Sequence, residues 1–208
     1  EFTQKNIQCA TKKRQTPLQE ITYTAKDGLN EYKTKFAIFG FQYALIEGDI
    51  DWKMLGQTRQ GQFPIQFIFM KATEGGDYTD DRFAANFDSA RVHGFVRGAY
   101  HFYNPKTDAN KQADFFIQSV KLEPGDLPPV LDIEKKGKDM KKLQADLKVW
   151  LRKVENHYGV KPIIYASYKF KTRYLNDSVF NTYPYWIAHY YVDSVRYEGD
   201  WRFWQHTD

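Results

Sequence analysis

The sequence holds a single cysteine, Cys9, in 208 residues. One thiol excludes an internal disulfide framework and a zinc site built from cysteines. Its five histidines give no metal signal either, because none of them stands at the short spacing of a ligand pair such as H-x-x-x-H. We therefore expect neither a metal nor any other cofactor.

Long hydrophobic runs are also missing. Apolar runs such as Ile65–Met70 and Tyr183–Ala188 are short, and Gln66 interrupts the first of them and Pro184 the second. Both fall far short of the roughly 20 apolar residues that a membrane helix needs. We expect no membrane insertion by this chain.

The excess of charge of one sign is small, whereas aromatic residues are plentiful. The formal net charge of +4 suits an anionic polymer without requiring one. No concentrated basic stripe of the nucleic-acid-binding kind stands out along the domain, so we do not expect nucleic acid as a partner. Aromatic residues make up 17% of the chain. This content fits either a large packed core or a surface on which sugar rings stack, and composition does not separate the two.

The first part of the chain differs from the rest. Residues 1–34 are polar and basic, with few periodic apolar positions, and we interpret them as a leader or linker. Alternation over Ile21–Ala25 is compatible with a short edge strand there. Residues 35–208 are assigned to one barrel domain.

From residue 35 onward, apolar runs of strand length alternate with amphipathic segments. Strands are expected at 36–43, 67–72, 95–102, 129–134, 163–166, 185–191 and 202–205, and helices at 51–55, 80–94, 108–120, 139–158 and 168–175. Apolar strands that alternate with helices indicate a parallel sheet covered by helices. The predicted fold class is α/β, a TIM-like barrel of five βα units plus three helix-poor strands.

The sharpest local signal is the pair Asp132 and Glu134 at the end of an apolar strand. The period of two puts both carboxyls on one face, roughly 7 Å apart along the strand. In a parallel barrel that face points inward at the end where active sites lie. Mutual repulsion would raise the pKa of one carboxyl, which provides an acid for glycosidic bond cleavage. The alternative is a strand end whose carboxylates are hydrated or paired with Lys135 and Lys136.

Other predicted strands also end in aromatic or polar residues, including His101. Each one alone is explained by core packing, but a ring of them around two carboxylates indicates a sugar-binding mouth. The candidate substrate-binding residues are Gln42, Tyr100, Phe102, Tyr165, His189 and Trp204.

A series of short motifs resembles the lysozymes of glycoside hydrolase family 25. They are Gly48–Trp52, Lys71–Gly75, Gly98–Phe102, Gln112–Phe116, Gly125–Glu134, Pro162–Tyr165 and Trp186–Tyr190. The resemblance covers about Phe36 to Gln205. It implies an eight-stranded barrel that cleaves the β-1,4 bond between N-acetylmuramic acid and N-acetylglucosamine in peptidoglycan. It further implies Glu134 as general acid/base, with Asp132 orienting the substrate acetamido group during its attack on the anomeric carbon.

Two departures from the family pattern bear on activity. Gln42 stands where the family has an active-site Asp in its first strand, and an amide cannot supply that negative charge. The family also has an eighth strand with a further Asp, which we do not find before Asp208. Both departures lower the expected activity without changing the expected fold.

The leading interpretation is a peptidoglycan hydrolase, impaired to the extent that Gln42 limits it. The alternative is a non-catalytic descendant of the same fold that still binds glycan strands. In both cases the expected partner is the peptidoglycan glycan strand, the expected oligomeric state is a monomer, and the expected location is secreted or in the cell envelope, with any targeting segment outside this chain.

Overall fold

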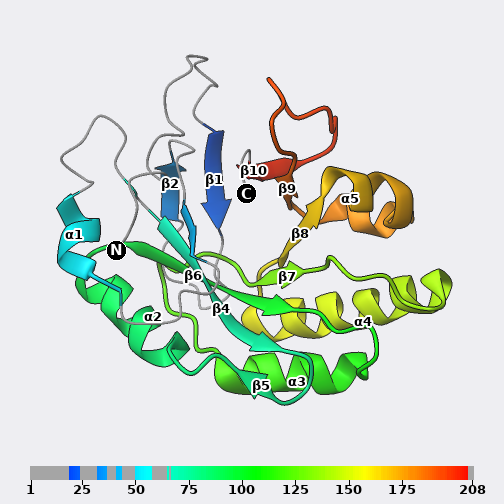
Figure 1. Cartoon of the computed structure of the whole chain (residues 1–208), viewed down its shortest axis with the longest axis horizontal. Helices are drawn as coiled ribbons and strands as arrows, with labels where there is room; N and C mark the ends of the chain where they lie inside the picture. Colours follow the sequence, from blue (N-terminus) through cyan, green and yellow to red (C-terminus); the bar gives the residue numbers. More distant parts are fainter. Residues whose placement is uncertain are drawn as a thin grey trace.

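The computed structural model describes the backbone of residues 19–23, 32–36, 41–43, 50–57, 65 and 67–205, and the side chains of residues 50–53, 55–56, 65 and 67–205. Most of this part of the chain forms one strongly curved sheet with helices along it (Figure 1).

Seven strands form a continuous path in the order β10-β9-β8-β7-β6-β4-β3, and every neighbouring pair on this path is parallel. Their bounds are β3 Phe41–Tyr43, β4 Phe67–Glu74, β6 Val96–Phe102, β7 Val130–Asp132, β8 Ile163–Ser167, β9 Tyr185–Ala188 and β10 Trp201–Gln205. A short strand, β5 (Tyr78–Thr79), pairs antiparallel with the end of β4. The mixed α/β class therefore agrees with the sequence prediction.

Contacts between aromatic rings show that the sheet curls. The ring of Phe69 on β4 lies 4.8 Å from that of Trp186 on β9 and 5.3 Å from that of Phe203 on β10. Three strands separate β4 from β9 in the sheet order, so these rings can meet only across the inside of a curved sheet. Among the described strands, no ladder joins the edges β3 and β10. A closed TIM-like barrel with a third helix-poor strand therefore stays a prediction.

Helices follow the strands along the chain and cover the outer face of the sheet. Figure 1 shows α2, α3 and α4 side by side along one face of β4, β6 and β7. The helices are α1 Trp52–Gln57, α2 Phe83–Val92, α3 Ala109–Ser119, α4 Met140–Tyr158 and α5 Tyr168–Tyr174, with a 3₁₀ helix at Ser178–Thr182. None of the helices in the described ranges has the length and apolar character needed to cross a membrane.

Polar caps set several of the helix ends. Asp108 accepts a hydrogen bond from the backbone N–H of Lys111 at the start of α3, and Asp139 caps α4 in the same way. Gly159 ends α4 in the left-handed conformation that glycine tolerates best, with φ of 70°. Helix α2 begins at Phe83, a few residues later than the start expected at residue 80. Arg82 holds the N-cap position, and Asp80 accepts from its backbone N–H at 2.9 Å.

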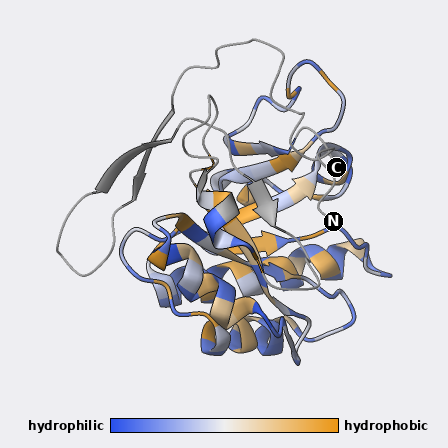
Figure 2. Ribbon diagram, turned by 60° about the vertical axis from the view of Figure 1, so that its left-hand side comes forward, coloured by the Kyte–Doolittle hydropathy of each residue, from blue (hydrophilic) through white to orange (hydrophobic). Residues whose placement is uncertain are grey.

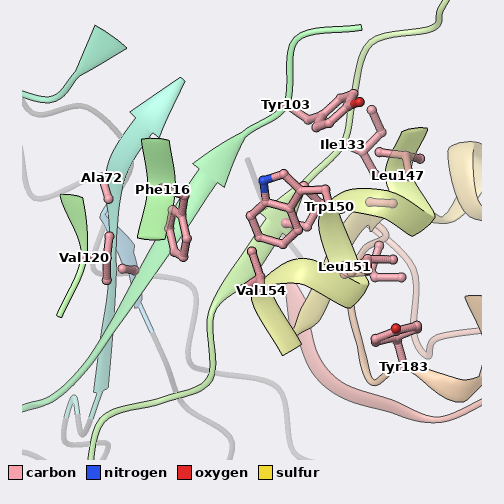
Figure 3. Close-up of a cluster of buried hydrophobic side chains, with 14 of the residues drawn as sticks. Ala72, Tyr103, Phe116, Val120, Ile133, Leu147, Trp150, Leu151, Val154 and Tyr183 are labelled. Carbon is pink, nitrogen blue, oxygen red and sulfur yellow. The ribbon is translucent and has the colours of Figure 1, made fainter. Parts of the chain in front are cut away.

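The larger core lies between the sheet and the helices. Figure 3 shows Trp150 of α4 among Phe116, Leu151 and Val154, and Figure 2 shows apolar residues gathered on the strands and on the helix faces turned toward them. On α3, Ala109, Ala113 and Phe116 are buried at helical spacing, and on α4 the buried residues are Leu143, Leu147, Trp150, Leu151 and Val154. Val92 is different, because it is 82% exposed two positions beyond buried Ala90, on the far side of α2.

A second core fills the inside of the curved sheet. It consists of Phe67, Phe69, Tyr100, Leu127, Val130, Ile163, Tyr165, Trp186, Ala188 and Phe203. Gly98 on β6 makes room for this packing, because a Cβ atom there would lie 2.4 Å from the ring of Phe69. The inner face is therefore filled with side chains up to the carboxyl ends of the strands.

The predictions for the first 43 residues are tested only in part. Strands β1 (Gln19–Tyr23) and β2 (Tyr32–Phe36) form a separate antiparallel pair, and β1 overlaps the edge strand expected near residue 21. The strand expected over 36–43 is represented by the end of β2 and by β3, with positions 37–40 outside the described residues. The division into a leader and a barrel domain stays a prediction.

Candidate active site

Asp132 is the last residue of β7 and lies on the inner side of the sheet. Parallel pairing sets it beside Phe102 of β6 and Tyr165 of β8, and its own carbonyl oxygen accepts the Tyr103 N–H at 2.9 Å. Its side chain is 4% exposed, and its Oδ1 atom has no hydrogen-bond partner among the described residues. A buried polar atom without a partner is costly, which makes this oxygen a candidate for contact with a ligand.

The surroundings of Asp132 disfavour its charged form. Burial raises the pKa of this carboxyl well above its usual value, and the negative charges of Glu134 and Glu74 act in the same direction. The ammonium groups of Lys71 and Lys135 partly oppose this rise in pKa. Repulsion within the pair was expected to raise the pKa of the carboxyl that serves as the acid. In the structure the raised pKa belongs to Asp132, not to the assigned acid Glu134, and burial contributes more to it than repulsion.

Glu134 follows just beyond the strand and is exposed. Between the two carboxylates, Ile133 is fully buried in the outer core and its N–H donates to the Tyr165 carbonyl oxygen at 3.0 Å. The extended alternation therefore continues past the end of β7, with Ile133 directed toward the helices and Asp132 toward the inside of the sheet. One carboxyl is shielded from water and the next is open to it.

A pair of charges at the end of β4 lies close to this site. The Lys71 ammonium, on a residue that is 9% exposed, donates to Glu74 Oε2 at 2.6 Å and lies 5.2 Å from the ring centre of Phe102. The other Glu74 oxygen faces the Lys135 ammonium at 3.8 Å. These contacts connect β4 to the segment that carries Glu134.

Sequence reasoning gave Lys71 and Glu74 no role, although it quoted their motif. In a regular strand, residues three apart point to opposite faces, so contact between these two side chains requires a departure from regular strand pairing. The pairing of β4 with β6 shifts register between Lys71 and Thr73. Ala72 packs in the outer core and Thr73 bonds to His101 there, so the shift returns Glu74 to the side of Lys71.

The candidate substrate-binding tyrosines are more deeply placed than a sugar-stacking surface requires. Tyr100 and Tyr165 are 3% and 4% exposed, and the Tyr165 ring packs edge-on against Trp186 at 4.9 Å. The Tyr165 hydroxyl donates to Gln205 Oε1 at 2.8 Å. The rings of Tyr100 and Tyr165 belong to the inner core. A role for either residue in binding substrate stays a prediction.

The other candidates lie nearer the surface. Phe102, His189 and Trp204 are half-buried; the His189 ring stacks on Tyr168 at 4.5 Å, and Trp204 Nε1 donates to the His189 carbonyl oxygen at 2.8 Å. Burial lowers the pKa of His189, with a further contribution from Arg196.

Strand β9 ends at Ala188, before His189. A turn follows in which Tyr191 has φ of 55°, so the strand is shorter than the one predicted to extend to residue 191. Gln42 is paired in register with Phe69, and its side chain lies outside the described ones.

His101 was expected at the mouth, and this expectation was wrong. Alternation along β6 turns it to the helix side, where it is fully buried between Thr73 Oγ1 at 2.8 Å and Gln112 Oε1 at 3.1 Å. Burial lowers the pKa of His101 to about 4, so the ring is neutral at pH 7. Its contacts join β4 and β6 to α3. Among the described residues, no group of three His, Cys, Asp or Glu side chains is arranged to hold a metal ion.

A carboxyl pair at the carboxyl end of a parallel sheet is an arrangement that glycoside hydrolases use. The sequence model of Glycosyl hydrolases family 25 matches residues 43–208, and the chain belongs to this family. A family 25 glycosyl hydrolase from Bacillus anthracis has a similar structure, with a TM-score of 0.73 and 32% identity over 83% of this chain and 80% of that chain.

Two curated relatives are similar in sequence to this chain. The uncharacterized protein YegX of Escherichia coli is 41% identical over 175 residues, which are 83% of this chain and 64% of YegX. Lysozyme M1 of Streptomyces globisporus is 30% identical over 185 residues, 81% of this chain and 61% of that protein. The chain thus spans less than two thirds of the length of either relative.

Proposed function

We propose that this protein is a peptidoglycan hydrolase that cleaves the β-1,4 bond between N-acetylmuramic acid and N-acetylglucosamine. The observation that carries the proposal is the buried Asp132 carboxyl, whose Oδ1 atom has no hydrogen-bond partner among the described residues, beside an exposed Glu134 just after β7. Family membership and the name of the relative Lysozyme M1 favour the wall glycan as substrate.

In the proposed reaction, Glu134 donates a proton to the leaving glycosidic oxygen. The acetamido oxygen of the substrate attacks the anomeric carbon, and the C–O bond to the leaving sugar breaks. Asp132 orients the acetamido group, because its Oδ1 atom has no partner within the described part of the protein and is available to the substrate amide. Glu134, now ionised, then takes a proton from the water that opens the cyclic intermediate.

Glu134→Gln is the direct test of this assignment. Loss of a general acid typically lowers the rate by about 10²–10⁴, and an exposed side chain can be changed at little cost in stability. We expect the variant to lose clearance of a peptidoglycan suspension and release of reducing ends, while it still sediments with the same material. Glu123→Gln is a matched control, because Glu123 is also exposed and lies beyond α3, away from the carboxyl end of β7.

The same measurement separates the second candidate function, a glycan-binding protein without catalysis. Gln42 favours this alternative, since the amide lacks the charge that the family pattern places in the first strand. A wild-type protein that sediments with peptidoglycan without releasing reducing ends would establish the binder. Retention of most activity by Glu134→Gln would show that another group is the acid.

A further inference from the structure

Sequence reasoning found no concentrated basic stripe along the domain, but a short and strongly basic segment begins directly after Glu134. Residues 135–142 contain five lysines and one aspartate, a net charge of 5 − 1 = +4. The other residues carry 25 lysines and arginines against 25 aspartates and glutamates, because 30 − 5 and 26 − 1 are equal. The formal net charge of the whole chain is therefore the charge of this segment, which we call the lysine loop.

The lysine loop lies at the carboxyl end of the sheet and faces solvent. It connects β7 to α4, and all five of its lysines are exposed. The Lys135 ammonium lies 4.5 Å from the ring centre of Phe102, and the Lys136 ammonium lies 4.5 Å from that of Tyr174 at the end of α5. The loop thus extends from the candidate acid toward the neighbouring α5 on the same rim.

Most of these charges are not neutralised within the described part of the protein. Lys142 pairs with Asp146, and Lys135 faces Glu74 at 3.8 Å. Among the described residues, no carboxylate forms an ion pair with Lys136, Lys138 or Lys141. Arg173 on α5 adds a further positive charge beside Tyr174.

Local structure does not explain this concentration of positive charge. Lys141 and Lys142 occupy the first turn of α4, where the helix dipole disfavours cations, and no acidic residue occupies that turn. Asp139 already satisfies the backbone N–H groups of both residues, at 2.8 and 3.1 Å. Repulsion among the lysines is a further cost, and an anionic partner would offset it.

We propose that the lysine loop binds the carboxylates of the peptides attached to the glycan, beside the bond that is cleaved. This inference rests on the proposed function, because the muramic acid side of that bond carries the peptide. A peptide next to the scissile bond is brought to the rim on which Glu134 lies. The loop then increases affinity for peptide-bearing glycan and takes no part in bond breaking.

The test compares Lys136→Gln/Lys138→Gln/Lys141→Gln with wild type on two soluble substrates. One is uncross-linked glycan from a Gram-negative wall, which carries peptides and no teichoic acid; the other is the same glycan after an amidase has removed the peptides. We expect KM to rise about tenfold on the first substrate, with kcat unchanged, because several weak exposed ion pairs are lost. On the stripped glycan we expect no difference between the two proteins.

The control variant removes the same charge at the opposite end of the sheet. Lys121→Gln/Lys153→Gln/Lys161→Gln should match wild type on both substrates. Raising the salt concentration from about 0.05 M to about 0.5 M should remove the advantage of wild type over the loop variant, because exposed charges are screened.

A loop variant that equals wild type on peptide-bearing glycan, or that is weakened equally on both substrates, would overturn the inference. If wild type cleaves neither substrate, the proposed cleavage fails. The same comparison is then made with dissociation constants measured by isothermal titration calorimetry on the two soluble glycans, and a loss confined to peptide-bearing glycan would still support the loop's role.

Discussion

Replacing Asp132 with asparagine should make the protein more stable while it loses activity. The carboxyl is 4% exposed and its Oδ1 atom lacks a partner among the described residues, so the folded state bears the cost of a buried acidic group. Leaving a buried polar group unsatisfied costs about 1–3 kcal/mol in either residue and more if the group is charged, so the two residues differ by the extra cost of the charge. Asparagine has nearly the same shape and cannot ionise. We expect the free energy of unfolding at pH 7 to rise by about 1–3 kcal/mol, and Tm by about 2–4 °C per kcal/mol.

The sign of the pH dependence follows from the raised pKa of Asp132. Below the unfolded-state pKa of about 3.9, this group is protonated in both states and contributes nothing to the difference. As the pH rises toward the folded-state pKa, the unfolded state loses its proton first, so wild type is progressively destabilised relative to the variant. The stability difference should therefore be near zero at about pH 3 and reach its full value above the folded-state pKa.

Asp126 provides a matched control with the opposite expectation. Its side chain is 7% exposed, but it accepts hydrogen bonds from Arg97 Nε at 2.7 Å, Arg97 Nη2 at 3.1 Å and the Glu123 N–H at 2.8 Å. Asp126→Asn should lower the free energy of unfolding by about 1.5–3 kcal/mol. Urea denaturation of the three proteins between pH 3 and pH 7 measures both effects. If Asp132→Asn proves less stable than wild type at pH 7, the carboxylate has a stabilising partner and the reasoning is refuted.

Two further substitutions test the surroundings of the carboxylates. Tyr165→Ala should lower the free energy of unfolding by about 3–5 kcal/mol in denaturant titrations, because the buried ring packs on Trp186; a loss below about 1 kcal/mol, with weakened glycan binding, would place the ring at an open surface instead. Gln42→Asp should raise the rate of peptidoglycan cleavage at least about tenfold, because a charge in a site of low polarity is worth several kcal/mol of transition-state stabilisation. No gain in a variant that still binds peptidoglycan would show that Gln42 is not the limiting group.

The strands and helices were predictable because their causes are local. The apolar runs that became β4 and β6, and the spacing of Leu143, Leu147 and Trp150 on α4, follow from periodicity alone. The position of Asp132 at a strand end was predictable for the same reason.

The features that the sequence did not predict depend on contacts between strands that are distant along the chain. The register shift near Lys71 arises from pairing of β4 with β6 and has no marker in the local pattern. The depth of Tyr165 depends on Trp186 and Gln205, which come from other strands of the curled sheet. A tyrosine at a strand end therefore could not be assigned to the surface or to the core before the curvature was known.

The packing of Phe69, Trp186 and Phe203 has a consequence for how a long polymer meets this protein. These rings come from β4, β9 and β10 and occupy the interior of the curled sheet, so the described part of the molecule has no passage along the sheet axis. Under the proposed function, a glycan strand would therefore lie across the strand ends to reach Glu134 and would not pass along the inside of the described sheet. Binding in that direction requires no free end of the glycan strand, so we expect cuts within the polymer. The average length of the glycan strands should therefore fall steeply from the first turnovers.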